Sequence, residues 1–216
     1  MLLTNLLYSI KDKIKKLYRY RILKSAAKKD FVIISNNCWG AEIYKRYNKP
    51  YNTPFIGLFL YGPDYIKLLQ DFKYYMALPL VFVNQSRWEK ELKYPVGKLD
   101  DIEIHFMHYA NEEEAALKWQ RRLARMNRVT EDDEYYFKIC DRAETSEKII
   151  RDFHHLPFSN KISFGINDYQ IKNHIVIIEN DNNVCVPDGV KLYLIMNKYI
   201  KIDKWILYNE LVKRRH

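Results

Sequence analysis

The stretch FVIISNNCWGAEIYKRY, residues 31–47, decides the fold class of this chain. Its first five residues are a short apolar run rich in β-branched side chains, which is typical of a buried strand. The NNCWG that follows marks a turn, and the apolar spacing after it predicts a short helix to about Tyr47. A buried strand that leads directly into a helix indicates an α/β protein.

The same alternation continues along the rest of the chain. Strands are predicted at 31–35, 55–61, 78–84, 135–140, 161–165 and 174–180, with a further extended segment at 94–109. Helices are predicted from an Asp64 cap to about residue 77, from an Asn111 cap with Glu114 as its capping-box partner, at 146–155 and around 204–212. This order predicts a three-layer α/β/α sandwich with a mixed, partly parallel sheet. We expect one α/β domain over 29–216, preceded by a helix over 1–28.

The positive charge of the chain is concentrated at its start. The formal net charge is +9, from 36 Lys plus Arg and 27 Asp plus Glu, and residues 1–30 hold nine of the bases but two of the acids. The remaining 186 residues are therefore close to neutral, with 27 bases and 25 acids. A nucleic-acid-binding domain is basic over a whole face, so no nucleic-acid partner is expected.

The first segment has the pattern of a basic amphipathic helix. Its apolar residues recur at spacings of three and four, and lysines and arginines fill most of the remaining surface. Through residues 2–24 such a helix could lie on an anionic membrane surface. The alternative is that the apolar stripe packs on the domain and the lysines are solvated.

Several classes of protein are disfavoured by what the sequence lacks. The six glycines form neither of the phosphate-cradling patterns GxGxxG and GxxxxGK[ST]. Cys38, Cys140 and Cys185 are far apart and form no CxxC motif, which predicts a cytoplasmic protein without disulfides. No apolar run approaches the roughly 18 residues that span a bilayer, and the early positive charges follow the first apolar stretch, unlike those of a secretory signal.

The first candidate site is the turn after the strand at 31–35. Ligands in open α/β sheets bind beyond the carboxyl ends of strands, so Asn36 and Asn37 could position a sugar hydroxyl, a carboxylate or a phosphate. Cys38 could act as a nucleophile, because a helix start lowers the pKa of a thiol. The alternative is that the asparagines only cap the turn and that Cys38 packs as a small apolar residue.

The second candidate site lies in DDIEIHFMHY, residues 100–109. In a strand, Asp101, Glu103 and His105 would share one face. Two carboxylates and an imidazole are the ligands of a divalent cation such as Mg²⁺ or Mn²⁺, or an acid/base set. The alternative is an edge strand with a solvated polar face.

The third candidate site is a row of cations on the helix that follows Asn111. Lys118, Arg122 and Arg125 follow one another at spacings of four and three, with Arg121 adjacent. These cations are predicted to share a sector away from the Trp119 stripe, where they could grip a phosphate or an acidic sugar. The alternative is a solvated face that pairs with Glu114. His108, Asp141 and Arg142 are further polar residues near predicted strand ends.

Six segments together resemble a bacterial family of unknown function whose members often carry the name exopolysaccharide biosynthesis protein. They are IISNNCWGAEIY, TPFIGLFLYGPDYIKLL, YPVGKLDDIEIHFMHY, EEAALKWQRRLARMN, CDR and LPFSNKISF, which together span roughly residues 31–165. The resemblance implies a three-layer α/β/α domain and a cell-surface polysaccharide context, but brings no activity with it. Ala41 departs from the family, which often has glycine there.

Carried over to this chain, the family pattern includes Asn36, Asn37, Cys38, Tyr94, Pro95, Gly97, Asp101, Glu103, His105, His108, Lys118, Trp119, Arg122, Asn127, Asp141 and Arg142. The leading hypothesis is a transferase-like enzyme acting on a nucleotide-sugar or a lipid-linked glycan, with Asp101, Glu103 and His105 as catalytic or metal-binding groups. In this hypothesis Asn36 and Asn37 position sugar hydroxyls, and Arg121 and Arg122 neutralise phosphate. The chief alternative is a non-catalytic glycan-binding or scaffolding subunit.

Overall fold

The computed structural model describes residues 2–131 and 134–214, with side chains described from residue 10 onward. Four parallel strands form its central sheet in the order β1-β5-β6-β7. Their bounds are β1 (Val32–Ser35), β5 (Tyr135–Cys140), β6 (Asn160–Gly165) and β7 (His174–Val176). β1 and β6 are buried throughout, as expected of strands covered on both faces.

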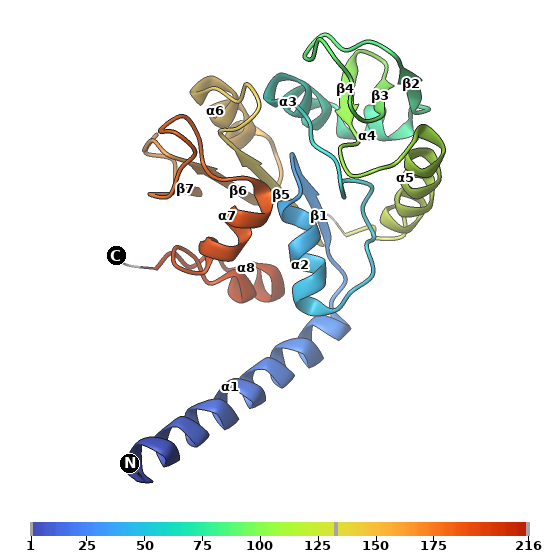
Figure 1. The fold of residues 1–216 in the computed structure, drawn as a ribbon. Coiled ribbons are helices and arrows are strands. Elements are labelled where there is room, and N and C mark those ends of the chain that lie inside the picture. The colour runs from blue at the N-terminus through green and yellow to red at the C-terminus, as the bar shows by residue number, and fades with distance from the viewer. Residues whose placement is uncertain (1, 132–133, 215–216) are drawn as a thin grey trace.

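Helices cover both faces of this sheet (Figure 1). On one face a core forms with α2 (Trp39–Tyr47), α7 (Gly189–Met196) and α8 (Ile202–Tyr208). The core of the other face includes α3 (Gly62–Gln70), α4 (Phe72–Ala77) and side chains of α6 (Glu147–His155). The predicted α/β class and layering are confirmed, and successive residues of β1 belong to opposite cores, as the pleat of a strand requires.

The antiparallel strands form a second, separate sheet. It contains β2 (Val81–Val83), β3 (Val96–Leu99) and β4 (Ile102–His105) in that order. α5 (Glu112–Met126) follows it, and the Asn111 side chain accepts a hydrogen bond from the amide of Glu114 at 2.9 Å, which confirms the predicted cap. Apolar side chains of β3, β4 and α5 belong to the same core as those of α3 and α4, so this sheet packs on the core that covers one face of the parallel sheet.

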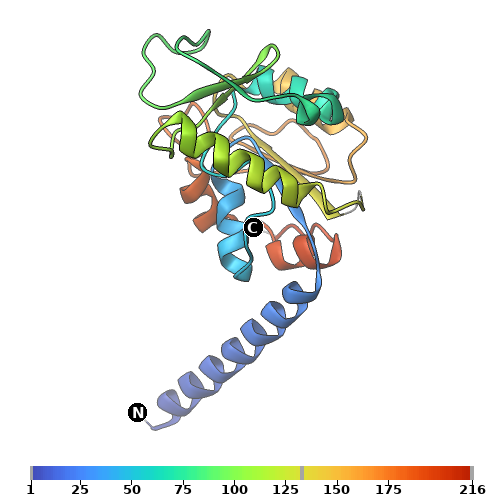
Figure 2. The ribbon, with the colours of Figure 1, turned by 90° about the vertical axis from the view of Figure 1, so that its right-hand side faces the viewer.

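α1 (Leu2–Lys28) projects away from the body of the molecule (Figures 1 and 2). Ile22 and Ala26 are buried against the body, and the Tyr18 hydroxyl donates to Asp203 of α8 at 3.1 Å. The side chains of Ile14 and Leu17 are exposed, so the alternative in which this apolar stripe packs on the domain is wrong for these residues. Within the described residues, no helix combines the length and the apolar character needed to cross a bilayer.

The structure corrects three local expectations. Residues 55–61 form a buried irregular segment with one isolated bridge, Phe59 to His105, instead of a strand. α3 begins at Gly62 after Tyr61, and Asp64 is buried instead of capping the helix. Residues 96–105 form a hairpin, so Asp101 lies in its turn and not in a strand.

Candidate functional site

A pocket of about 470 Å³ opens at the carboxyl edge of the parallel sheet, and we call it the edge pocket. β1 leads into α2 on one face of the sheet, whereas β5 leads into α6 on the other face. Adjacent parallel strands whose connections diverge in this way leave a crevice, which is where ligands bind in open α/β sheets. The pocket is lined by Asn36, Asn37, Cys38, Phe59, Tyr61, Met107, His108, Arg142, Ala143, Asp188, Gly189 and Val190.

Two asparagines and a buried lysine form the floor beneath this pocket. The ammonium of Lys138, which is fully buried on β5, donates to the side-chain oxygens of Asn37 at 2.9 Å and Asn36 at 3.2 Å. The Asn37 amide nitrogen lies 3.3 Å from the sulfur of Cys140. The predicted pair Asn36 and Asn37 therefore lines the pocket and also fixes a cation behind it.

The floor beneath the pocket holds a buried amine and the start of a helix. Burial lowers the pKa of Lys138, and among the described residues no carboxylate forms an ion pair with its ammonium. The amide of Trp39 at the start of α2 donates to the Asn37 side chain at 3.2 Å, so the positive end of that helix dipole also lies at the floor. An anion in the pocket would offset the cost of keeping this cation away from water.

Arg142 brings a second cation to the pocket wall. Its Nη1 atom donates to the carbonyl of Val186 at 2.7 Å and to the carboxylate of Asp181 at 2.5 Å. Asp141 accepts from the amides of Ile166 and Val186, both at 2.8 Å, and burial raises the pKa of its carboxyl group. Arg142 therefore lines the pocket as predicted, whereas Asp141 holds two loops together behind it.

The start of α7 closes one side of the edge pocket. Asp188 caps α7 by accepting from the amides of Val190 and Lys191, both at 3.0 Å. Gly189 lies so close to α2 that a Cβ atom there would come within 2.6 Å of the Trp39 amide nitrogen. The pocket thus depends on a glycine where two helix starts meet.

Aromatic rings form the opposite wall. Tyr61 stacks on Trp88, with ring centroids 4.6 Å apart and an angle of 12° between the planes. Phe59 stacks on His105 with centroids 4.8 Å apart. Since Phe59 and Tyr61 also line the pocket, this wall offers flat apolar surface beside the polar floor.

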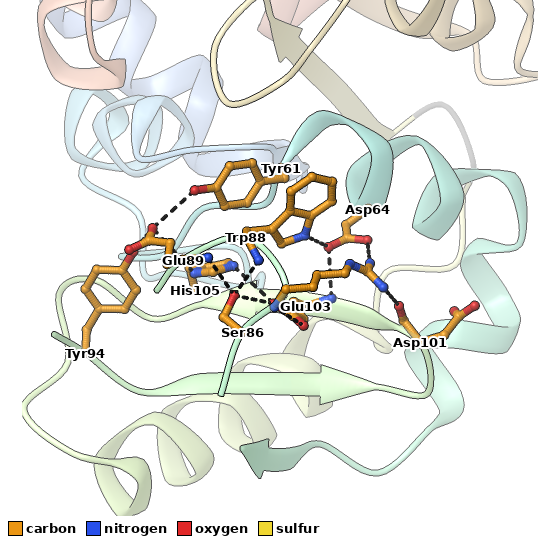
Figure 3. Close-up of polar contacts among 10 residues, drawn as sticks. Tyr61, Asp64, Ser86, Trp88, Glu89, Tyr94, Asp101, Glu103 and His105 are labelled. Atoms are coloured by element: carbon orange, nitrogen blue, oxygen red, sulfur yellow. Dashed lines mark hydrogen bonds and ion pairs between the residues drawn. The ribbon is translucent and has the colours of Figure 1, made fainter. Parts of the chain in front are cut away.

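Glu103 and His105 lie behind that wall in a cluster that does not line the edge pocket (Figure 3). Glu103 accepts from the Ser86 hydroxyl at 2.6 Å and from the Arg87 amide at 3.2 Å. His105 is fully buried, with ring nitrogens 3.8 Å from Glu103 and 4.0 Å from Glu89, beyond hydrogen-bond distance. Burial lowers the pKa of His105, which favours the neutral imidazole.

Asp101 is directed away from Glu103 and His105 (Figure 3). Its carboxylate contacts Lys67 and accepts from the Tyr75 hydroxyl at 2.9 Å, and the hydrogen bond from Lys67 lowers its pKa. The expectation that Asp101 shares a face with the other two is wrong, because the hairpin turn comes before β4 begins. Among the described residues no group of three or more His, Cys, Asp or Glu side chains could hold a metal ion.

The cations of α5 do not line the edge pocket. Lys118 pairs with Glu114, as the solvated alternative predicts, and Arg121 is exposed. Arg122 is buried and donates to the Tyr109 hydroxyl at 2.5 Å, so the prediction that it shares an outer sector away from Trp119 is wrong. Its guanidinium also lies over the ring of Tyr51, which explains how a helix face can bury an arginine.

His108 and Cys38 both line the edge pocket, with different chemical consequences. The side chain of His108 is exposed to solvent. Cys38 precedes α2, but burial raises the pKa of its thiol. A thiol held in its protonated form is a poor nucleophile, so the structure favours the packing alternative for Cys38.

Sequence reasoning missed several residues of this region, among them Lys138, Tyr61 and Asp188. Lys138 interrupts the apolar strand YYFKIC. A single lysine in a strand predicted to be covered on both faces is unusual, and it could have marked this position as a candidate site residue. Tyr61 and Asp188 come from segments far away in sequence, and only the fold brings them to the pocket. Asp64 accepts from Trp88 at 2.6 Å and from the Glu103 amide at 3.2 Å, which positions the loop behind Tyr61.

Comparison with known proteins places this fold and pocket in a family. The family model described as domain of unknown function (DUF1919) matches residues 9–208. An uncharacterized protein of Haemophilus influenzae is 40% identical over 164 residues, which is 74% of this chain and 75% of that protein. The match spans all the described strands, α1 from residue 9 onward, α2 to α8, and every residue that lines the edge pocket. The chain therefore belongs to the DUF1919 family of unknown function.

Proposed function

We propose that this protein binds a phosphate-bearing activated sugar or a lipid-linked glycan in the edge pocket and acts as a transferase of cell-surface polysaccharide assembly in the cytoplasm. The single observation that carries the proposal is the composition of the pocket. It combines the side-chain amides of Asn36 and Asn37 on its floor, Lys138 buried beneath them and Arg142 on one wall with the rings of Phe59 and Tyr61 on the opposite wall. Hydroxyl and phosphate groups fit the amides and cations, and the apolar face of a sugar or base fits the aromatic rings.

The biological context of the proposal comes from the motifs SNNCWG and YPVGKLDDIEIHFMHY and their resemblance to proteins named for exopolysaccharide biosynthesis. The three cysteines are free thiols in the structure, which supports a reducing compartment. A metal-assisted step at Asp101, Glu103 and His105 is not part of the proposal, because these side chains do not meet around one point. His108 lines the pocket, and its imidazole could act on a bound ligand as a general acid or base.

One observation also favours a second function, a non-catalytic glycan-binding subunit. The predicted acid/base set does not line the edge pocket, and Asp188 already uses its carboxylate to cap α7. In this second function the pocket holds a glycan through its amides and rings, and no group needs to titrate.

Calorimetric titration with UDP-sugars, sugar phosphates and neutral oligosaccharides tests the pocket itself. The Tyr61→Ala variant should weaken binding by about tenfold or more, because a stacking surface is lost. Tyr74→Ala is the matched control, since Tyr74 is exposed and does not line the pocket. Equal affinity of the two variants, or no heat with any of these ligands, would contradict the proposal.

Release of the nucleotide from a bound UDP-sugar then separates the two functions. A transferase should release it in the presence of an acceptor glycan, and His108→Ala should slow the release while binding persists. Binding without release in the wild-type protein would support the non-catalytic subunit.

A further inference from the structure

We infer that α1 docks this protein on the surface of an anionic phospholipid bilayer, through an apolar stripe that the body of the molecule leaves uncovered. The stripe consists of Ile10, Ile14 and Leu17, which are 44%, 61% and 54% exposed. At 100° per residue these positions fall within about 60° on the helix circumference. In the sequence Leu3 and Leu7 continue the same spacing.

The base of α1 is attached to the body through a different side of the helix. Ile22 and Ala26 are buried in the core and lie about 130° around the helix from the stripe. Tyr18 and Arg19 add hydrogen bonds to Asp203 and to the carbonyl of Arg46. The last turns are therefore fixed, while the earlier turns project away from the body (Figure 2) and carry the exposed stripe.

The charge around the stripe identifies the surface that covers it. Residues 10–21 contain six cations, Lys11, Lys13, Lys15, Lys16, Arg19 and Arg21, and a single acid, Asp12. Asp12 pairs with Lys16 at 2.9 Å. A membrane with anionic headgroups attracts such a helix at about 1 kcal/mol per nearby cation, while its acyl region accepts the apolar side chains.

The same charge disfavours a second copy of the chain as the occupant. Pairing two stripes would bring two sets of these cations together, and like charges at a helix interface repel. The body of each molecule is close to neutral, with 27 bases and 25 acids, so its net charge does not offset this repulsion. Anionic lipid is the partner that satisfies both the apolar stripe and the cations.

Co-sedimentation of the full chain with vesicles tests this inference. The protein should bind vesicles of phosphatidylglycerol and phosphatidylcholine, bind pure phosphatidylcholine at least about tenfold more weakly, and dissociate as salt is raised. Ile14→Asp should weaken binding by about tenfold or more, whereas Val184→Asp, at an exposed valine on the body, should not. Replacement of Lys11, Lys13, Lys15 and Lys16 by Gln should weaken binding more than the same change at the exposed Lys73, Lys90, Lys93 and Lys201.

Four results would overturn the inference. They are no vesicle binding by the intact chain, equal binding to neutral vesicles, equal losses in the matched lysine variants, and a dimer in analytical ultracentrifugation that Ile14→Asp dissociates. Circular dichroism of each variant confirms that the body is folded. Ligand binding in the edge pocket is measured without vesicles, so its outcome is independent of this test.

Discussion

At position 138 a lysine interrupts a strand that is otherwise apolar and covered on both faces. Its ammonium is held by two asparagine oxygens beneath the edge pocket, with no carboxylate paired to it among the described residues. A cation is costly in such a position, and an anion bound in the edge pocket would offset part of that cost. At the scale of the residue, Lys138 is therefore the side chain at which the proposed phosphate ligand can be tested.

We predict that Lys138→Met abolishes binding of sugar phosphates but leaves the protein folded. Because burial lowers the pKa of Lys138, the unfolded chain binds more protons than the folded chain between that lowered pKa and the ordinary value of 10.5. The free energy of unfolding should rise with pH in this window for the wild-type chain, and the rise should be smaller in the variant. Denaturant titrations at several pH values measure this difference.

The control for this prediction is Lys98→Met, on a strand of the second sheet. It should leave both the sugar-phosphate affinity and the alkaline pH profile near those of the wild type. If Lys138→Met binds sugar phosphates as tightly as the wild type, the proposal that this pocket binds an anionic ligand is wrong.

At the scale of the element, the approach of α7 to α2 shapes the edge pocket. Gly189 permits this approach, since a Cβ atom would meet the Trp39 amide at 2.6 Å and the Asn37 side-chain oxygen at 2.8 Å. Both partners belong to the turn that also holds Lys138. A shift of α7 therefore changes the pocket floor as well as its side.

Gly189→Ala should destabilise the protein by about 1–3 kcal/mol and weaken ligand binding, because backbone atoms must move to admit the methyl group. Leu194→Ala is the control, at an exposed side chain of the same helix that does not line the pocket. It should cost much less stability. Thermal unfolding together with calorimetric titration distinguishes the two, and equal stability of both variants would refute the close approach.

At the scale of the whole molecule, acid should loosen the parallel sheet near β6. The ring of His154 on α6 lies 2.7 Å from the Ser163 hydroxyl, which lies 2.8 Å from His174 on β7. Burial lowers the pKa of His154 to about 4. The unfolded chain therefore binds more protons between about pH 6.5 and pH 4, and stability falls as pH falls through this range.

His154→Gln should remove part of this acid sensitivity, roughly 1–2 kcal/mol after allowance for the partly exposed ring. His155→Gln is the control, because His155 is the exposed neighbour on the same helix. Chemical denaturation of the three proteins between pH 7 and pH 4 measures the effect. Parallel loss of stability in all three would show that His154 does not drive it.

The sequence by itself determined the α/β class, the positions of most helices and the turn that contributes Asn36 and Asn37 to the site. The strand at 32–35, the turn with Asn36 and Asn37, and the Asn111 cap are all local patterns, set by side-chain periodicity and capping chemistry within a few residues. The apolar spacing of α1 was likewise visible in the sequence, whereas the exposure of Ile14 and Leu17 was decided by the structure. These features depend on near neighbours, which a sequence displays.

Only the tertiary structure decided which polar residues meet. Asp101 lies in the turn between β3 and β4, so it does not follow the alternation that places Glu103 and His105 on one face of β4. Burial of Arg122 depended on Tyr51 and Tyr109, and the edge pocket gathered Tyr61, Arg142 and Asp188 from three distant segments. These contacts between residues distant in sequence follow from the packing of two sheets and their helices. The spacing of residues along the chain does not predict such packing.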